Sequence, residues 1–209
     1  MILNVILALE FVCVGAGLIN FNALIPRSLR LIVIYLGLSL LFELLLIPLP
    51  DKTGIWIRSQ YDLMFPLEFA LYINLFQPKL IRLFWSASVC LAGFGVYQLV
   101  WHMNDQDSAT NLFLVMSLLM LPVLLLYFWS LISRSDVVVL YKEPLFWIAV
   151  SLLFFYSGNI IVTGFYFKLN TQDKKLSHLL FYINYTLTIV RYSVFTVAFG
   201  MAGRRHDER

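Results

Sequence analysis

The sequence is short of charge, and this shortage excludes most classes of protein. Only 13% of the 209 residues are Asp, Glu, Lys or Arg, whereas 61% are hydrophobic. A soluble domain carries about 25% charged and roughly 45–50% apolar residues, and the mean hydropathy of +0.83 points the same way. The net charge of +3 is also too small and scattered for a phosphate-binding surface. Soluble globular, disordered, collagen-like and nucleic-acid-binding proteins are therefore excluded, and a polytopic membrane protein is expected.

Residues and motifs that carry chemistry are equally scarce. The two cysteines, Cys13 and Cys90, lie in apolar stretches, where we expect packing residues rather than a disulfide. The sequence holds no HExxH, GxSxG or GxxxxGK[ST] motif and no Cys/His cluster with metal-ligand spacing, so no metal and no cofactor is predicted. The predicted last span contains no lysine, which excludes a retinal Schiff base in the usual position. These absences make an enzyme the less favoured class.

Long hydrophobic runs dominate the chain. A spanning helix needs about 20 predominantly apolar residues. The first run follows Met1 with no basic segment before it, so we expect a retained helix rather than a cleaved signal peptide. The third run is the weakest, because it carries Asp62, Glu68 and Asn74. The seven predicted spans are 2–24, 30–49, 60–77, 80–101, 111–132, 145–167 and 176–202.

These runs predict an all-α transmembrane bundle of seven spans. Residues 1–203 would form one membrane domain, and residues 204–209 a short charged cytoplasmic tail. All five tryptophans lie near predicted span ends, where an interfacial aromatic belt is expected. Nine Lys and Arg residues fall on the side of the C-terminus and five on the other side. This bias predicts an inner (plasma) membrane protein with its N-terminus outside and its C-terminus in the cytoplasm.

A weak internal repeat suggests how the spans are grouped. The string LSLLF at 38–42 in the second span is echoed by VSLLF at 150–154 in the sixth. The fourth span, between the two halves, is rich in Ser, Ala and Gly, which suits a closely packed central helix. A 3+1+3 arrangement of the seven spans is one way to combine these observations.

Ionisable residues inside the predicted spans are the strongest pointers to a site. Each costs about 2.5–3.5 kcal/mol at a helix centre on insertion scales. With the predicted topology, three of the acids lie in the outer half of the membrane, in a layer shared with Asn159 and Asn184, while Glu68 and Arg191 lie near the middle. The five ionisable residues are Glu10, Glu43, Asp62, Glu68 and Arg191.

Helical spacing arranges the polar and aromatic residues in narrow stripes on four spans. Residues three or four positions apart share one face of a helix. Polar groups cannot favourably face lipid, so we expect these four stripes to face each other. The stripes are Tyr35, Ser39 and Glu43; Tyr61, Phe65, Glu68 and Tyr72; Tyr156, Asn159 and Thr163; and Asn184, Thr188 and Arg191.

Two interpretations of these residues remain open. Arg191 would pair most simply with Glu68, and otherwise with Glu43, in an ion pair that orders the bundle. The alternative is a ligand or ion site, because one internal cation among four ionised acids would leave a net charge of −3. Mid-span prolines at 66 and 122 would bend their helices and could line such a site. The candidate ligand- or ion-binding residues are Glu43, Asp62, Glu68, Tyr72, Asn159, Asn184 and Arg191.

Three strings resemble a known family. They are PLEFALY at 66–72, EPLFW at 143–147 and FFYSGN at 154–159, which cover parts of the third and sixth spans. Together they resemble an uncharacterised family of small seven-helix bacterial membrane proteins that are sometimes encoded beside sensor kinases. The resemblance supplies no site residues, but it implies a sensory or partner-binding role.

The sequence therefore favours a receptor-like sensory or partner-binding module with a polar pocket in the outer half of the bundle. Its partners would be the lipid bilayer and a cytoplasmic or membrane protein, because the short loops leave no room for an output domain. A small-solute or ion-coupled transporter is the alternative, since carriers bind substrates near the midplane. A membrane-embedded hydrolase that uses carboxylates is the third choice.

Overall fold

The structure, a computed structural model, describes residues 2–24, 27–46, 66–77, 86, 89–90, 93, 107–133, 142–170 and 174–207. In this part of the chain every regular element is helical, as the hydrophobic runs predict. The helices are α1 (Ile2–Ile19), the short 3-10 helix η1 (Phe21–Ala23), α2 (Arg27–Leu46), an unlabelled helix over Pro66–Phe76, α5 (Asp107–Ile132), α6 (Pro144–Asn170) and α7 (Lys174–Asp207).

Three of the described helices are long and apolar enough to cross a membrane. Their apolar portions are Phe113–Ile132 in α5, Pro144–Phe165 in α6 and Tyr182–Arg204 in α7. They correspond to the predicted spans 111–132, 145–167 and 176–202. Asn4–Ile19 of α1 and the Pro66–Phe76 helix are apolar but shorter. Transmembrane helices are thus supported in the second half of the chain, whereas the count of seven stays a prediction.

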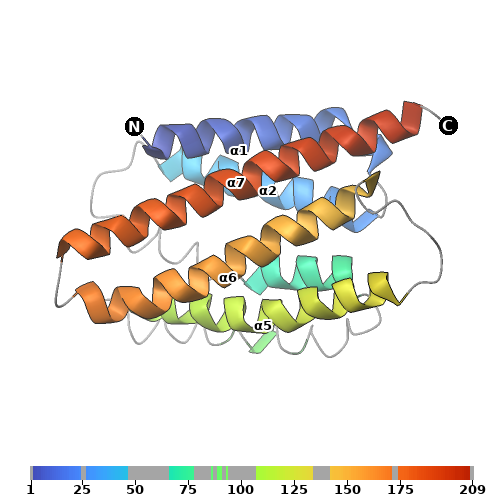
Figure 1. The fold of residues 1–209 in the computed structure, drawn as a ribbon. Coiled ribbons are helices and arrows are strands. Elements are labelled where there is room, and N and C mark those ends of the chain that lie inside the picture. The colour runs from blue at the N-terminus through green and yellow to red at the C-terminus, as the bar shows by residue number, and fades with distance from the viewer. Residues whose placement is uncertain are drawn as a thin grey trace.

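The helices lie along one another in a bundle, with α7 between α1 and α6 (Figure 1). Helices α1 and α7 are parallel, because Cys13 lies beside Thr196 and Gly17 lies beside Phe199. Helix α6 runs antiparallel to α7 and α5 (Figure 1), and its rings Phe155 and Phe146 pack against Phe113 and Phe128 of α5. These directions decide which side chains can meet.

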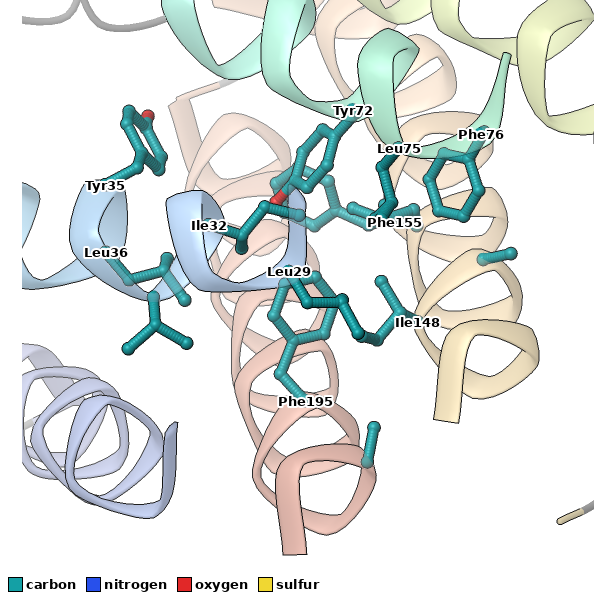
Figure 2. Packing of buried hydrophobic residues seen from close by; sticks show 14 of the residues in the cluster. Leu29, Ile32, Tyr35, Leu36, Tyr72, Leu75, Phe76, Ile148, Phe155 and Phe195 are labelled. Atoms are coloured by element: carbon teal, nitrogen blue, oxygen red, sulfur yellow. The ribbon is translucent and has the colours of Figure 1, made fainter. Parts of the chain in front are cut away.

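The interior of the bundle is a single hydrophobic core. Figure 2 shows residues that four helices contribute to this core, among them Leu29 and Ile32 of α2, Leu75 of the Pro66–Phe76 helix, Ile148 of α6 and Phe195 of α7. The outer surface is apolar as well, which a soluble protein rarely tolerates over large areas. Exposed side chains of this surface include Phe11, Leu41, Leu125, Trp129, Phe154, Ile161 and Val197. An apolar exterior around an apolar core is what a lipid environment requires.

Hydroxyl groups in the interior are satisfied within their own helices. Ser117 donates to the carbonyl of Phe113, and Ser151 donates to that of Ile148. This local bonding hides a polar group where no water is available. Such hydroxyl groups form no hydrogen bonds between helices. Polar contacts across the bundle therefore come from a few other side chains.

Several smaller expectations have mixed outcomes. Pro122 lies inside α5, as predicted, whereas the described helix begins at Pro66, so a bend before it falls outside the described residues. Both cysteines are free, and Cys13 is buried in the core. Cys90 is exposed, so the expectation that it packs inside was wrong.

The predicted fourth span, 80–101, lies almost entirely outside the described residues. Its four described residues, Ser86, Val89, Cys90 and Gly93, are all exposed, and their spacing places them on one helical face. The exposure of these four residues differs from the closely packed central helix that the small residues predict. The 3+1+3 arrangement is accordingly left as an expectation from sequence.

Candidate functional site

A buried ion pair stands at the middle of the bundle. Arg191 of α7 donates through Nη2 to Oε1 of Glu68, and the same nitrogen donates to the Tyr72 hydroxyl at 2.9 Å. The hydroxyl of Tyr35 on α2 donates to the other oxygen of Glu68 at 3.1 Å. Glu68 and Arg191 are only 5% and 6% exposed. We call Tyr35, Glu68, Tyr72 and Arg191 the polar centre.

Simple rules of helix geometry and charge explain this arrangement. Glu68 and Tyr72 lie four residues apart, so both side chains leave the Pro66–Phe76 helix on the face that meets α7. An arginine cannot shed its charge by losing a proton, so at this depth it needs a counter-charge. The predicted pairing of Arg191 with Glu68 is confirmed. Its bonds join α2, the Pro66–Phe76 helix and α7.

Aromatic rings enclose the guanidinium group of Arg191. Its central carbon lies 4.7 Å from the ring centroid of Phe155, 5.6 Å from Tyr192 and 5.7 Å from Phe195. The ring of Tyr72 is 5.9 Å away. Ring faces attract a cation, so the rings stabilise the charge while keeping water out. Figure 2 shows Phe155 and Phe195 entering the core from α6 and α7.

The two phenylalanines were not among the residues singled out from sequence. A signal for Phe195 exists, because it follows Arg191 by four residues and therefore shares its face of α7. Phe155 precedes Asn159 by four residues on α6. Both were passed over because phenylalanine is abundant throughout the chain, with 18 copies, and carries no distinguishing pattern.

Several polar atoms near the polar centre are buried without a hydrogen-bond partner among the described residues. They are both carboxyl oxygens of Glu10, Oδ1 of Asn159 and Nε of Arg191. Asn159 is 1% exposed, and its amide nitrogen donates only to the carbonyl of Phe155 in its own helix, at 2.9 Å. Unpartnered buried polar groups are costly, so Asn159 differs from Glu68, both of whose carboxyl oxygens accept hydrogen bonds.

The remaining candidate residues are distributed around the polar centre. Glu43 of α2 and Asn184 of α7 are half-buried, and the backbone carbonyl of Asn184 accepts a hydrogen bond from Thr188. Asp62 lies outside the described residues. The structure therefore brings Glu68, Tyr72 and Arg191 into direct contact. Asn159 lies one helical turn after Phe155, the α6 residue that contacts Arg191.

The four predicted stripes meet as expected where they can be followed. Tyr35 of α2 contacts Glu68, Glu68 contacts Arg191 of α7, and Arg191 lies on Phe155 of α6, next to Tyr156. The polar face of each of the four helices thus points inward. Tyr61 and Phe65, at the start of the third-span stripe, lie outside the described residues.

No group of three or more His, Cys, Asp or Glu side chains that could hold a metal occurs in the part of the chain that the structure describes. A hollow of about 420 Å³ lies on α1, lined by Asn4, Val5, Ala8, Leu9 and Val12. None of these lining residues belongs to the polar centre. Among the described residues, the polar centre is thus a buried network built on one ion pair.

Comparison with known proteins adds no identification. No protein-family model, no curated protein and no solved structure matches the chain. The function has to be argued from the polar centre and its surroundings.

Proposed function

We propose that the chain is a seven-span helical protein of the plasma membrane, with its N-terminus outside and its C-terminus in the cytoplasm. The helix directions support this count. Glu68 and Tyr72 meet Arg191 and Phe195 in the same order, so the Pro66–Phe76 helix runs parallel to α7. Helices α1 and α5 share this direction, whereas α2 and α6 run against it.

These helix directions indicate one further spanning helix. The Pro66–Phe76 helix and α5 run the same way, so we propose that one further span joins them. The apolar run at 80–101 is long enough for that span. The excess of Lys and Arg on the side of the C-terminus supports the orientation. A reporter enzyme fused after Arg209 should behave as cytoplasmic, and an external signal would contradict the orientation.

The proposed function is that of a receptor-like sensory or partner-binding module. One observation carries it: a buried cation, Arg191, links α7 to the Pro66–Phe76 helix through charge-assisted hydrogen bonds to Glu68 and Tyr72, and Tyr35 extends the network to a third helix, α2. These bonds are strong only at short range, so a small shift of one helix exchanges one packing arrangement for another. Two discrete arrangements are what a signalling bundle needs.

An ion-coupled carrier is the second candidate function. The unpartnered carboxyl of Glu10 and the unpartnered oxygen of Asn159 favour it, because carriers keep spare oxygen ligands near the midplane. A carboxylate hydrolase has less support, since Arg191 already occupies Glu68. The two leading functions differ in what crosses the membrane: a conformational change for the module, a solute for the carrier.

The discriminating experiment attaches a photo-crosslinking residue at Arg204, an exposed position near the end of α7. In the native cell, a sensory module should give a discrete crosslinked protein product whose yield changes when Glu68→Gln breaks the polar centre. The matched control is Leu125→Ala on the exposed surface of α5, which should leave the yield unchanged.

The carrier is tested on the same protein in liposomes. Proton or sodium movement driven by an imposed gradient, and lost in Glu10→Gln, would favour the carrier. A crosslinked product that depends on Glu68, in a protein that moves neither ion, would favour the sensory module. Ion movement without any Glu68-dependent crosslink would overturn the sensory proposal.

A further inference from the structure

Two polar atoms at the boundary between α6 and α7 are buried and have no hydrogen-bond partner among the described residues. They are Oδ1 of Asn159 on α6 and Nε of Arg191 on α7. Asn159 is 1% exposed and Arg191 is 6% exposed, so neither side chain reaches the surface of the bundle. Buried polar atoms in folded proteins nearly always have a partner, because an unpartnered one is costly.

The contacts between α6 and α7 place these two side chains at neighbouring levels of the bundle. The guanidinium carbon of Arg191 lies 4.7 Å from the ring centroid of Phe155, four residues before Asn159. A Cβ atom at Gly158 would press against Leu187, four residues before Arg191. Both contacts fit one antiparallel register of the two helices (Figure 1).

The direction of the side chains brings them closer still. On a helix, each Cα–Cβ bond tilts toward the N-terminus of that helix. Arg191 therefore leans toward the level of Leu187, which is also the level of Gly158. Asn159 leans toward the level of Phe155, where the guanidinium group lies. Because the helices are antiparallel, the two side chains approach each other from opposite directions.

The hydrogen bonds already present fix what each unpartnered atom can do. The amide of Asn159 donates through Nδ2 to the carbonyl of Phe155 at 2.9 Å, so its other atom is the oxygen, which can only accept. Nη2 of Arg191 donates to Glu68 and Tyr72, and Nε of the same group can only donate. One atom thus lacks a donor and the other lacks an acceptor.

This complementary pair of atoms selects the chemistry of a ligand between them. An anion would accept from Nε but could not donate to Oδ1, and a metal cation would meet the positive charge of Arg191. A small neutral molecule that both donates and accepts fits both atoms, and water is the smallest such molecule. Buried waters in proteins make about three hydrogen bonds to polar groups that are otherwise unsatisfied.

We propose that one water molecule binds between α6 and α7, accepting a hydrogen bond from Nε of Arg191 and donating one to Oδ1 of Asn159. The water extends the hydrogen-bonded network of the polar centre to α6, so that all four helices with polar stripes share it. This site goes beyond the proposed sensory function, because its occupancy is measured on the purified protein without reference to signalling.

The test is an NMR measurement on the purified full chain in lipid nanodiscs, with arginine labelled by ¹⁵N. Magnetisation transferred from water to the Nε proton of Arg191 reports a water in contact with it. Arg191→Lys keeps the positive charge but has no Nε proton, so the signal that it lacks belongs to Arg191. We expect transfer to this proton whose rate does not change with pH, as for a bound water. Chemical exchange with solvent rises with pH instead, and the exposed Arg204 should show that behaviour.

Two substitutions make the result specific to Asn159. Asn159→Leu keeps roughly the size of the side chain and removes the acceptor, so the transfer to the Nε proton should be lost. Asn184→Leu is the matched control, because Asn184 is half-buried and lies two helical turns before Arg191. This variant should retain the transfer.

A distance measurement keeps the proposal falsifiable even if Asn159→Leu folds poorly. In the unmodified chain, labels at Nε of Arg191 and at the side-chain carbonyl of Asn159 report their separation. A bridging water sets Nε and Oδ1 about 4.5–5.5 Å apart, whereas a direct hydrogen bond sets them about 2.9 Å apart. A direct bond, or a separation too large for one water, overturns the proposal. Absence of transfer from water to Arg191, or transfer that persists in Asn159→Leu, overturns it as well.

Discussion

The two sides of α7 handle buried charge in opposite ways. On one side, Arg191 has Glu68 and Tyr72 as partners and rests on the ring of Phe155. On the other side, where α7 packs on α1, Glu10 is as deeply buried, lies beside the Tyr192 hydroxyl and forms no ion pair among the described residues. The ion pair on the first side joins α7 to the Pro66–Phe76 helix, whereas the carboxyl group on the second side has no bonded positive charge among the described residues.

The difference shows that depth alone does not define a role for an intramembrane acid. Glu68 and Glu10 are 5% and 1% exposed, and both lie within reach of the charge on Arg191. Their surroundings differ because Arg191 forms an ion pair with Glu68 and not with Glu10. Glu68 contributes an ion pair between helices, whereas Glu10 does not.

The largest effect should come from breaking the satisfied side. Glu68→Gln leaves the Arg191 guanidinium buried without its counter-charge, so the free energy of unfolding should fall by about 3–5 kcal/mol. The double variant Glu68→Gln with Arg191→Gln removes both charges and should lose less than Glu68→Gln alone. Unfolding by SDS titration in mixed micelles measures each variant.

The exposed cation of α7 provides the control for this series. Arg204→Gln removes a positive charge that is not enclosed by the bundle, and should change the free energy of unfolding by less than about 0.5 kcal/mol. If the losses of the two single variants simply add in the double variant, the energetic coupling between Glu68 and Arg191 is absent.

Much of the satisfied side could be predicted from the sequence. Arg191 is the one Lys or Arg near the middle of a predicted span, and Glu68 lies at a matching depth in a span that runs the same way. The high cost of an isolated charge in lipid then selects the pair. Tyr72 follows from its position one turn after Glu68. Such contacts can be predicted because an isolated charge in lipid is costly and few residues in the spans can pair with it.

The next effect concerns the packing of α1 on its neighbours. A Cβ atom at Gly17 would stand 2.6 Å from Val33 and 3.3 Å from the ring of Phe199, whereas one at Gly15 would meet nothing within 4 Å. Gly17→Ala should therefore lower the free energy of unfolding by about 1–3 kcal/mol, as overpacking does. Gly15→Ala is the matched control and should be neutral or slightly stabilising.

The same SDS titration decides this prediction. Equal stabilities for the two alanine variants would mean that α1 does not approach α2 and α7 closely at Gly17.

The side of α7 that packs on α1 could not be predicted from the sequence. Apolar residues cover α1 all round, so its pattern does not distinguish a face that meets lipid from one that meets α7. The rings of Phe155 and Phe195 were missed for the same reason. Weak, non-directional contacts among many similar side chains leave several packings open until the helices are placed.

A smaller effect should follow from trimming the polar centre without removing a charge. Tyr72→Phe deletes the hydroxyl that accepts the 2.9 Å hydrogen bond from Arg191 and keeps the ring. Hydrogen bonds between helices in membranes contribute about 1–2 kcal/mol at most. We expect a loss of that size, against no measurable change for Tyr182→Phe, whose side chain is exposed.

The smallest effect should come from a buried polar residue that is satisfied within its own helix. Ser117 is fully buried, and its hydroxyl donates only to the carbonyl of Phe113 one turn earlier in α5. That carbonyl keeps its helical hydrogen bond when the hydroxyl is removed, and alanine is the better helix former. Ser117→Ala should therefore change the free energy of unfolding by less than about 0.5 kcal/mol. A loss as large as that of Tyr72→Phe would mean that burial of a polar atom, rather than its bonding between helices, determines its contribution, and the contrast between the two sides of α7 would lose its basis.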